Sequence, residues 1–280
     1  DESNSSSSSE ELPKFWTWCG GHEDWNELEW KQLLEKLVGA GIGGVLIGGG
    51  AAEVRRVAPW AARADLKVHA WMWTFCRPRD DVAEKHMDWY QVSGVRKSSL
   101  TDPPYVGYYK WLCPSCPEAV DHIVSDAEAL AEIAEVSAVH LDYVRFPDVI
   151  LAKTLQPKYN IVQDREYPEW DFCYCSRCVK AFRKQTGQDI SAVQDASTVS
   201  EWKQFRYDLV CSVVQKVESV VRSHSKQLSA AVFPYPDLAR FICRQSWDSF
   251  PVDIFFPMIY HNFYGEPIRW IGGATARGKQ

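Results

Sequence analysis

The 280-residue sequence lacks the patterns that mark several common functional classes. Its 31 basic and 37 acidic residues are mixed along the chain, for a net charge of −6, and no basic stripe stands out. Nucleic acid is therefore not an expected partner, because proteins that bind the phosphate backbone gather Lys and Arg on one surface. The longest apolar stretch, near residues 42–47, is too short and too rich in glycine to cross a bilayer.

Cofactor-binding and metalloenzyme motifs are also missing. Gly48–Gly50 follows a predicted strand but lacks the spacing of a dinucleotide or phosphate loop, so no organic cofactor is expected. A metal-dependent hydrolase would need ligands at several strand ends, and His69, His140 and Asp142 could supply some of them. No HxH or HExxH run supports that hypothesis.

The composition that remains suits one large core. Hydrophobic residues make up 46% of the chain, and its length is close to the roughly 250 residues of a single TIM barrel. Tryptophan is abundant, with 13 residues against 3 methionines. Such a surplus indicates either a heavily aromatic core or flat platforms for sugar rings.

The N-terminal segment, residues 1–13, is predicted to be a disordered, acidic and serine-rich tether. Such runs resemble those that follow the lipidated cysteine of mature bacterial lipoproteins, which predicts a protein of the periplasm or bacterial cell surface. Contact with a membrane is expected only through such a lipid anchor. The alternative is an ordinary disordered chain end.

Residues 14–280 alternate between strand-like and helix-like segments, which favours a parallel α/β sheet. Strands are predicted at 15–19, 44–47, 67–73, 138–146, 228–233 and 253–260. Capping boxes are predicted at Asp24–Glu27 and Ser115–Glu118. The pattern predicts a (β/α)8 TIM-barrel fold of which six βα units are visible, and we expect the remaining units to lie beyond this sequence.

Asp142 is the leading catalytic candidate, since active sites of TIM barrels lie at the carboxyl ends of the strands. His140 and Asp142 share one face of the fourth strand. A carboxyl group inside an apolar strand is costly to bury unless it is paired, and Arg145 is a possible partner that would keep it ionised. The alternative is a buried Asp–Arg pair with a purely structural role.

Residues at other strand ends are candidates for substrate binding. Trp71 and Trp73 alternate on one face, and indole rings stack on the apolar faces of sugars. The alternative for a tryptophan is burial in the barrel core, and for His261 it is a structural hydrogen bond. The predicted substrate-binding residues are Trp18, Trp71, Trp73, Tyr143, Arg145, Tyr260 and His261.

Four runs resemble the family 10 glycosyl-hydrolase-like group of bacterial proteins: HLDYVRFP (140–147), WLCPSCPE (111–118), AAVFPYPDLAR (230–240) and FFPMIYHNFY (255–264). The resemblance covers about residues 14–275, and DYVRFP is its most specific element. It differs at Cys116, where that group commonly has Asn, and the group's barrel continues through strands seven and eight. The resemblance implies hydrolysis of glycosidic bonds in a poly- or oligosaccharide.

Glycoside hydrolysis ordinarily needs two carboxyl groups. The resemblance implies that Asp142 is the nucleophile or base. Asp237, just after the fifth strand, is the first choice for the second carboxylate, and capping of the following helix is its alternative. Glu23 and Glu266 are further candidates. A barrel that binds carbohydrate without catalysis is the competing hypothesis, and a lone Asp142 paired to Arg145 would favour it.

Three of the nine cysteines form a Cys-x-Cys-x2-Cys run, at Cys173, Cys175 and Cys178. This spacing suits zinc at the junction of a loop and a helix, with Cys113, Cys116 or a histidine as a fourth ligand. The predicted ion is structural rather than catalytic. The alternative is a set of thiols without metal.

Overall fold

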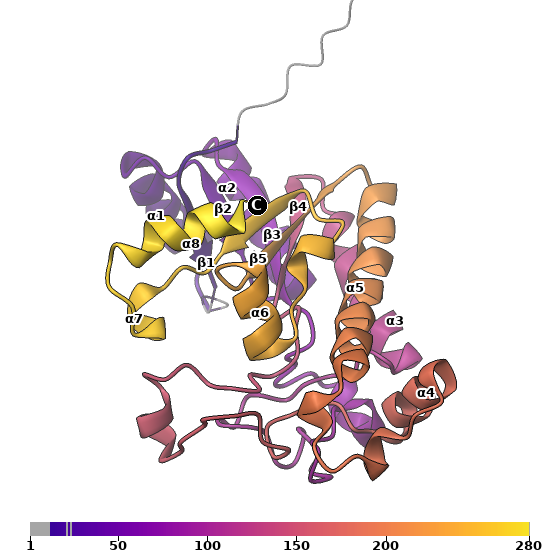
Figure 1. Cartoon of the computed structure of the whole chain (residues 1–280). Helices are drawn as coiled ribbons and strands as arrows, with labels where there is room; N and C mark the ends of the chain where they lie inside the picture. Colours follow the sequence, from indigo (N-terminus) through magenta and orange to yellow (C-terminus); the bar gives the residue numbers. More distant parts are fainter. Residues whose placement is uncertain (1–11, 21, 23, 280) are drawn as a thin grey trace, which may run out of the picture.

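The computed structural model describes residues 12–20, 22 and 24–279. Six parallel strands form one sheet in the order β1-β2-β3-β4-β5-β6. They are β1 (Trp16–Cys19), β2 (Gly44–Ile47), β3 (Lys67–Trp73), β4 (Val136–Asp142), β5 (Gln227–Val232) and β6 (Ile254–Pro257). The sheet curls, and helices follow the strands along its convex side (Figure 1). The fold is an α/β partial TIM barrel, as predicted.

The helices are α1 (Glu27–Gly39), α2 (Gly50–Arg63), α3 (Pro117–Ala131), α4 (Ser176–Thr186), α5 (Ser200–Ser223), α6 (Pro236–Cys243), α7 (His261–Tyr264) and α8 (Trp270–Gly278). Helices α1, α2, α3 and α5 pack side by side in that order against the outer face of the sheet. Between them and the strands lies the main core, in which Val45, Val68 and Leu141 are fully or almost fully buried. No helix within 12–20, 22 and 24–279 is long and apolar enough to cross a bilayer.

Both predicted capping boxes are misplaced. Helix α1 is capped by Asn26, whose side chain accepts from the backbone of Glu29, while the Glu29 carboxylate accepts from the Asn26 N–H. Two such boxes are available in the sequence, and the one two residues later forms. Helix α3 follows Cys116 and has Pro117 in its first turn, where a missing N–H costs nothing.

The inner face of the sheet is lined with aromatic rings that show how strongly the sheet curls. The ring of Phe256 on β6 lies 5.6 Å from Trp16 and 5.9 Å from Trp18 on β1, although these two strands stand at opposite ends of the strand order. Gly44 on β2 makes room for this layer, because a Cβ there would lie 2.4 Å from the Trp16 ring. The concave side is therefore filled at this level.

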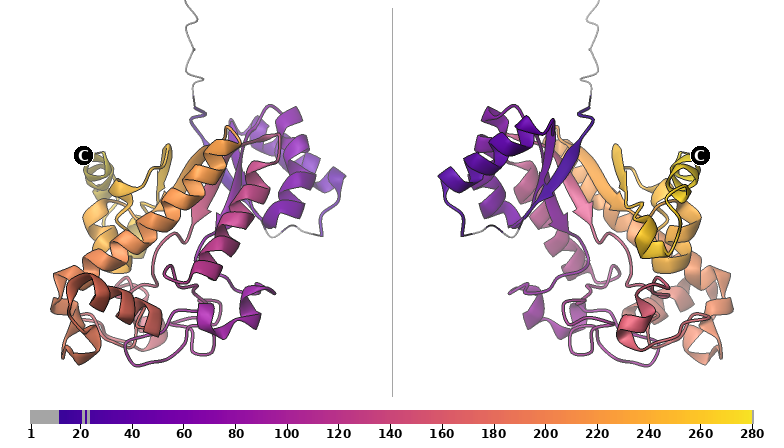
Figure 2. Two further views of the ribbon diagram at one scale, coloured as in Figure 1. Left: turned by 90° about the vertical axis from the view of Figure 1, so that its right-hand side faces the viewer. Right: turned by 90° about the vertical axis from the view of Figure 1, so that its left-hand side faces the viewer.

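Two long excursions gather at the carboxyl ends of the strands, where Figures 1 and 2 show them together below the sheet. One joins β3 to α3 and the other joins β4 to α4. They pair with each other, since Tyr174 N donates to Val92 O at 2.7 Å and Gly94 N donates to Asp171 O at 3.0 Å. A buried Arg206–Asp171 ion pair fastens the second excursion to α5. These segments form the walls around the candidate site.

Candidate active site

Asp142 is the last residue of β4 and its carboxylate is held by two neutral donors. Trp71 Nε1 on the neighbouring strand donates to Oδ2 at 3.1 Å, and the backbone N–H of Tyr143 donates to Oδ1 at 2.7 Å. Burial raises the pKa of Asp142 above its ordinary value, against the opposing effect of these hydrogen bonds and of the Arg145 charge. A carboxyl group in this state is suited to donate and accept protons near neutral pH.

The predicted ion pair between Asp142 and Arg145 is wrong. Arg145 Nη1 instead contacts Asp148 Oδ2 at 3.2 Å and donates to the Phe146 carbonyl at 2.9 Å. The strand ends at Asp142, and Tyr143 takes a left-handed conformation with φ of 49°, so the side chains beyond it no longer follow the strand's alternation. The chain turns, and the two side chains diverge.

Arg145 therefore lies beneath the site rather than at its surface. It is 5% exposed, and its guanidinium packs 5.0 Å from the rings of Trp111 and Phe233 and 5.4 Å from that of Tyr143. A buried cation between aromatic faces fixes their positions. The side chain that sequence analysis assigned to substrate binding supports the aromatic wall from behind.

The predicted aromatic platform is largely assembled. Trp73 packs against Tyr143 at 4.6 Å between ring centroids and against Tyr108 at 6.1 Å, and it lies 6.4 Å from Trp71. Tyr108 is 45% exposed. It comes from the first excursion, which sequence analysis marked only as a long loop of functional interest. Trp18 stands apart from this group, on β1, where its ring is 5.9 Å from His140.

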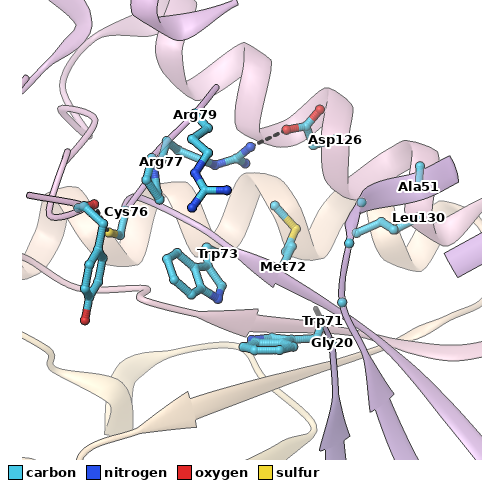
Figure 3. Close-up of a pocket in the computed structure, with 15 residues that line it drawn as sticks. Gly20, Ala51, Trp71, Met72, Trp73, Cys76, Arg77, Arg79, Asp126 and Leu130 are labelled. Atoms are coloured by element: carbon cyan, nitrogen blue, oxygen red, sulfur yellow. Dashed lines mark hydrogen bonds and ion pairs between the residues drawn. The ribbon is translucent and has the colours of Figure 1, made fainter. Parts of the chain in front are cut away.

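A cavity of about 620 Å³ opens beside this platform (Figure 3). Trp71 and Trp73 form its floor, and the Arg79 side chain reaches over it from the first excursion. The cavity is centred over β2 and β3, and Asp142 meets it through the Trp71 indole. Gly48 keeps that wall open, because a Cβ there would lie 2.7 Å from the Trp71 ring.

The second predicted carboxylate, Asp237, lies in a different environment. It stands in the first turn of α6 with its side chain 78% exposed, 3.4 Å from Arg240 Nη1 and 3.3 Å from Arg277 Nη2. It does not cap the helix either, since the N-cap residue is Tyr235. Glu23 lies outside the described residues, and Glu266 is exposed between α7 and α8. Within 12–20, 22 and 24–279, no hydrogen bond joins Asp142 to another carboxylate.

The remaining polar candidates divide by position. Tyr260 is 56% exposed; burial of its hydroxyl and the charge of Asp142 both raise its pKa. His261 makes a local turn contact, with Nδ1 2.9 Å from the Glu266 carbonyl oxygen. Only Tyr260 of this pair is therefore linked to the Asp142 carboxyl.

His69 and His140 lie inside the barrel, each with Nδ1 2.9 Å from the Ser229 hydroxyl. Burial lowers the pKa of His69 to about 3, so this ring is neutral at physiological pH. Among the described residues, no group with metal-ligand spacing includes His69, His140 or Asp142. The hypothesis of a metal-dependent hydrolase with these ligands thus gains no support.

The cysteines that sequence analysis singled out do come together. Cys173, Cys175 and Cys178 are joined by Cys113, and their sulfur atoms lie within 4.8 Å of one another. Cys116, the other candidate for the fourth position, instead donates to Glu118 at 3.3 Å. A second group with metal-ligand spacing is formed by Asp80, His122 and Asp126. It already contains a cation, because Arg77 forms ion pairs with both aspartates.

Similarity to known proteins lies in the fold. No family model matches the chain, and the curated proteins include no match to its sequence. Among solved structures, the glycoside hydrolase domain of PgaB (BpsB) from Bordetella bronchiseptica is similar, with a TM-score of 0.70 and 15% identity over 95% of this chain and 81% of that one.

Two larger glycosidases are similar at lower scores. For the β-galactosidase of the psychrophilic Marinomonas ef1 the TM-score is 0.53 and the identity 11%, over 78% of this chain and 37% of that one. For the GH36 α-galactosidase AgaA of Geobacillus stearothermophilus the values are 0.51 and 13%, over 94% and 33%. This chain thus spans about a third of their length. At such identities the likeness establishes a shared TIM-barrel-type fold, and these structural neighbours are glycoside hydrolases.

Proposed function

We propose that this chain is a glycoside hydrolase that cleaves a poly- or oligosaccharide with Asp142 as its proton-transferring carboxyl group. The observation that carries the proposal is the environment of Asp142. It ends a barrel strand, its pKa is raised by burial, and its Trp71 partner forms the floor of a cavity. Barrel enzymes place their reacting groups at this end of the sheet.

The aromatic surface fits the same class of substrate. Trp71, Trp73 and Tyr108 present indole and phenol rings around a cavity of about 620 Å³, a size suited to a few sugar units. Pyranose rings have apolar C–H faces that stack on such side chains. The resemblance of residues 140–147 to family 10 glycosyl-hydrolase-like proteins, and the class of the structural neighbours, support the same reaction.

A catalytic carboxyl group with a raised pKa is suited to the acid/base role rather than to that of a permanently ionised nucleophile. Protonated, it would donate to the leaving-group oxygen; ionised, it would take a proton from the attacking water. Its two hydrogen-bond donors hold the carboxyl plane in one orientation through both states. The role we assign to Asp142 is therefore that of acid/base.

The test is release of new reducing ends from a library of glycans, with the wild-type chain and the Asp142→Asn variant. Loss of the proton-transferring group is expected to lower kcat at least ~100-fold on any glycan that the wild type cleaves. Asp208→Asn is the matched control, because Asp208 lies on α5, away from the sheet's carboxyl end, where its carboxylate accepts from Gln204. Equal turnover by wild type and the Asp142 variant would refute the assignment.

A carbohydrate-binding barrel without catalysis is the second candidate. It is favoured by one specific observation, namely that the structure pairs Asp237 with two arginines instead of directing it to Asp142. This function predicts that the wild type binds a glycan, measured by calorimetry, while releasing no reducing ends from it. Binding would then survive in Asp142→Asn and weaken in Trp73→Ala, which removes part of the aromatic platform.

A further inference from the structure

Four buried cysteines from two distant segments meet at the carboxyl end of the sheet. Cys113 closes the excursion between β3 and α3, whereas Cys173 and Cys175 precede α4 and Cys178 lies in its first turn. Their four sulfur atoms lie within 4.8 Å of one another. None of the four residues is more than 9% exposed. We call this set the cysteine cluster.

The spacing of the sulfur atoms fits a bound ion better than a cross-link. Cys113 Sγ lies 3.6 Å from both Cys175 Sγ and Cys178 Sγ, and all four cysteines are free thiols. Four thiolates about 2.3 Å from a central zinc ion form a tetrahedron whose edges are about 3.8 Å. A disulfide bond, in contrast, brings its two sulfur atoms to about 2.05 Å. The cluster therefore has the dimensions of a tetrathiolate site.

The surroundings of the cluster supply donors that a thiolate needs. The Val92 N–H points to Cys173 Sγ at 3.4 Å, and the Cys178 N–H points to Cys175 Sγ at 3.5 Å. The Ser115 hydroxyl lies 3.1 Å from Cys113 Sγ and 3.0 Å from Cys178 Sγ. Hydrogen bonds of this kind orient thiolate ligands and offset part of their charge. Cys175 also caps α4, where the helix dipole favours a negative sulfur.

We infer that Cys113, Cys173, Cys175 and Cys178 bind one zinc ion. Sulfur ligands in a tetrahedral set select zinc, which has no redox chemistry of its own. All four positions are filled by protein, so the site has no place for water or substrate and its role is structural. The inference stands on the sulfur positions alone and does not depend on the proposed glycosidase activity.

The ion would fasten the two excursions that wall the candidate active site. Cys113 follows Trp111 by two residues, and the Trp111 ring lies 5.7 Å from Tyr143, beside Asp142. The other three ligands lie on the excursion that begins at Tyr143. Because both excursions are long and largely without regular structure, a metal cross-link between their ends removes much of their freedom in the unfolded chain.

The test is the metal content of the whole chain, purified under reducing conditions and measured by inductively coupled plasma mass spectrometry. The expected result is about one zinc per wild-type chain and at least a ~10-fold lower content in Cys113→Ser. Cys116→Ser is the matched control. Cys116 is as buried as Cys113 and only three residues away, but its thiol contacts Glu118, so this variant keeps its zinc.

A second measurement covers a Cys113 variant that fails to fold. Exchange of the wild-type metal for Co²⁺ is expected to give the intense charge-transfer absorption of thiolate ligands and the visible bands of a tetrahedral ion. A wild-type chain with reduced thiols and no stoichiometric zinc would overturn the inference. So would stoichiometric iron, a disulfide within the cluster found by mass spectrometry, or loss of zinc from Cys116→Ser while Cys113→Ser retains it.

Discussion

Asp142 and Asp237, the two carboxylates that sequence analysis expected to act together, occupy opposite environments. Asp142 ends a central strand, partly buried, and accepts hydrogen bonds from two neutral donors. Asp237 stands in the first turn of a surface helix, 78% exposed and flanked by two arginine side chains. The difference shows that a place after a barrel strand is not sufficient for acid/base chemistry. The carboxyl group must also be removed from water and left without a cation bonded to it.

The Trp71 hydrogen bond is the first way to test this contrast. Trp71→Phe removes the indole N–H that stabilises ionised Asp142, so the pKa of Asp142 should rise further. If Asp142 must be protonated to act, the high-pH limb of the kcat profile will move to higher pH. We expect kcat to fall about 10-fold, because the carboxyl group also loses its orientation.

Trp73→Phe is the control for this variant, since it makes the same ring change without touching an Asp142 bond. Its pH profile should keep the wild-type limbs while KM rises. An unshifted profile in Trp71→Phe would show that the indole bond does not tune the catalytic group.

Asp142 should also reduce stability in a pH-dependent way. Burial raises its pKa in the folded state, so the folded protein holds the proton more tightly than the unfolded chain does. The resulting penalty on folding is absent below the unfolded pKa of about 3.9 and is present in full above the folded pKa. Asp142→Asn removes a charge that is costly to bury, and its Tm should exceed that of the wild type by a few degrees at neutral pH.

Thermal unfolding followed across pH checks the sign. The advantage of Asp142→Asn should shrink as the pH falls through the folded pKa, because the wild-type carboxyl group is then protonated as well. A variant that is less stable than the wild type at neutral pH would mean that the ionised carboxylate is stabilised by its surroundings.

Asp237→Asn should have the smallest effect of the three. Its carboxylate is exposed and paired at 3.3–3.4 Å with arginines on α6 and α8, and exposed ion pairs contribute about 0–1 kcal/mol. We expect kcat within about 3-fold of the wild type and little change in Tm. A loss of kcat as large as that of Asp142→Asn would restore Asp237 as the second catalytic carboxylate.

Much of the fold could be predicted because strands and helices of an α/β protein carry local signals. The predicted bounds of β2 and β3 match those observed, since short apolar runs bordered by glycine or charge define them. The fourth strand was predicted too long at its end, because apolar residues continue through Phe146 although Tyr143 turns the chain. That turn decides where Arg145 points, and no residue pattern announced it.

The candidate site depended more on tertiary packing. Sequence analysis identified Asp142 and the tryptophans of β3, because their alternation on one strand is local. It missed Tyr108 and Arg79, whose positions over the cavity follow from the path of a long excursion. It likewise left open whether Cys113 or Cys116 completes the cysteine cluster. Only the pairing of two excursions distant in sequence directs Cys113 inward.

The measurement that tests the account most directly is the pKa of the Asp142 side-chain carboxyl, followed by ¹³C NMR in the wild-type chain. The resonance is assigned by its absence from Asp142→Asn, and the titration is repeated with a glycan that the wild type cleaves or binds. The account predicts a pKa clearly above the ordinary value of about 3.9 and a shift of the resonance on addition of the glycan. An ordinary or lowered pKa, together with a resonance that does not respond to glycan, would contradict it.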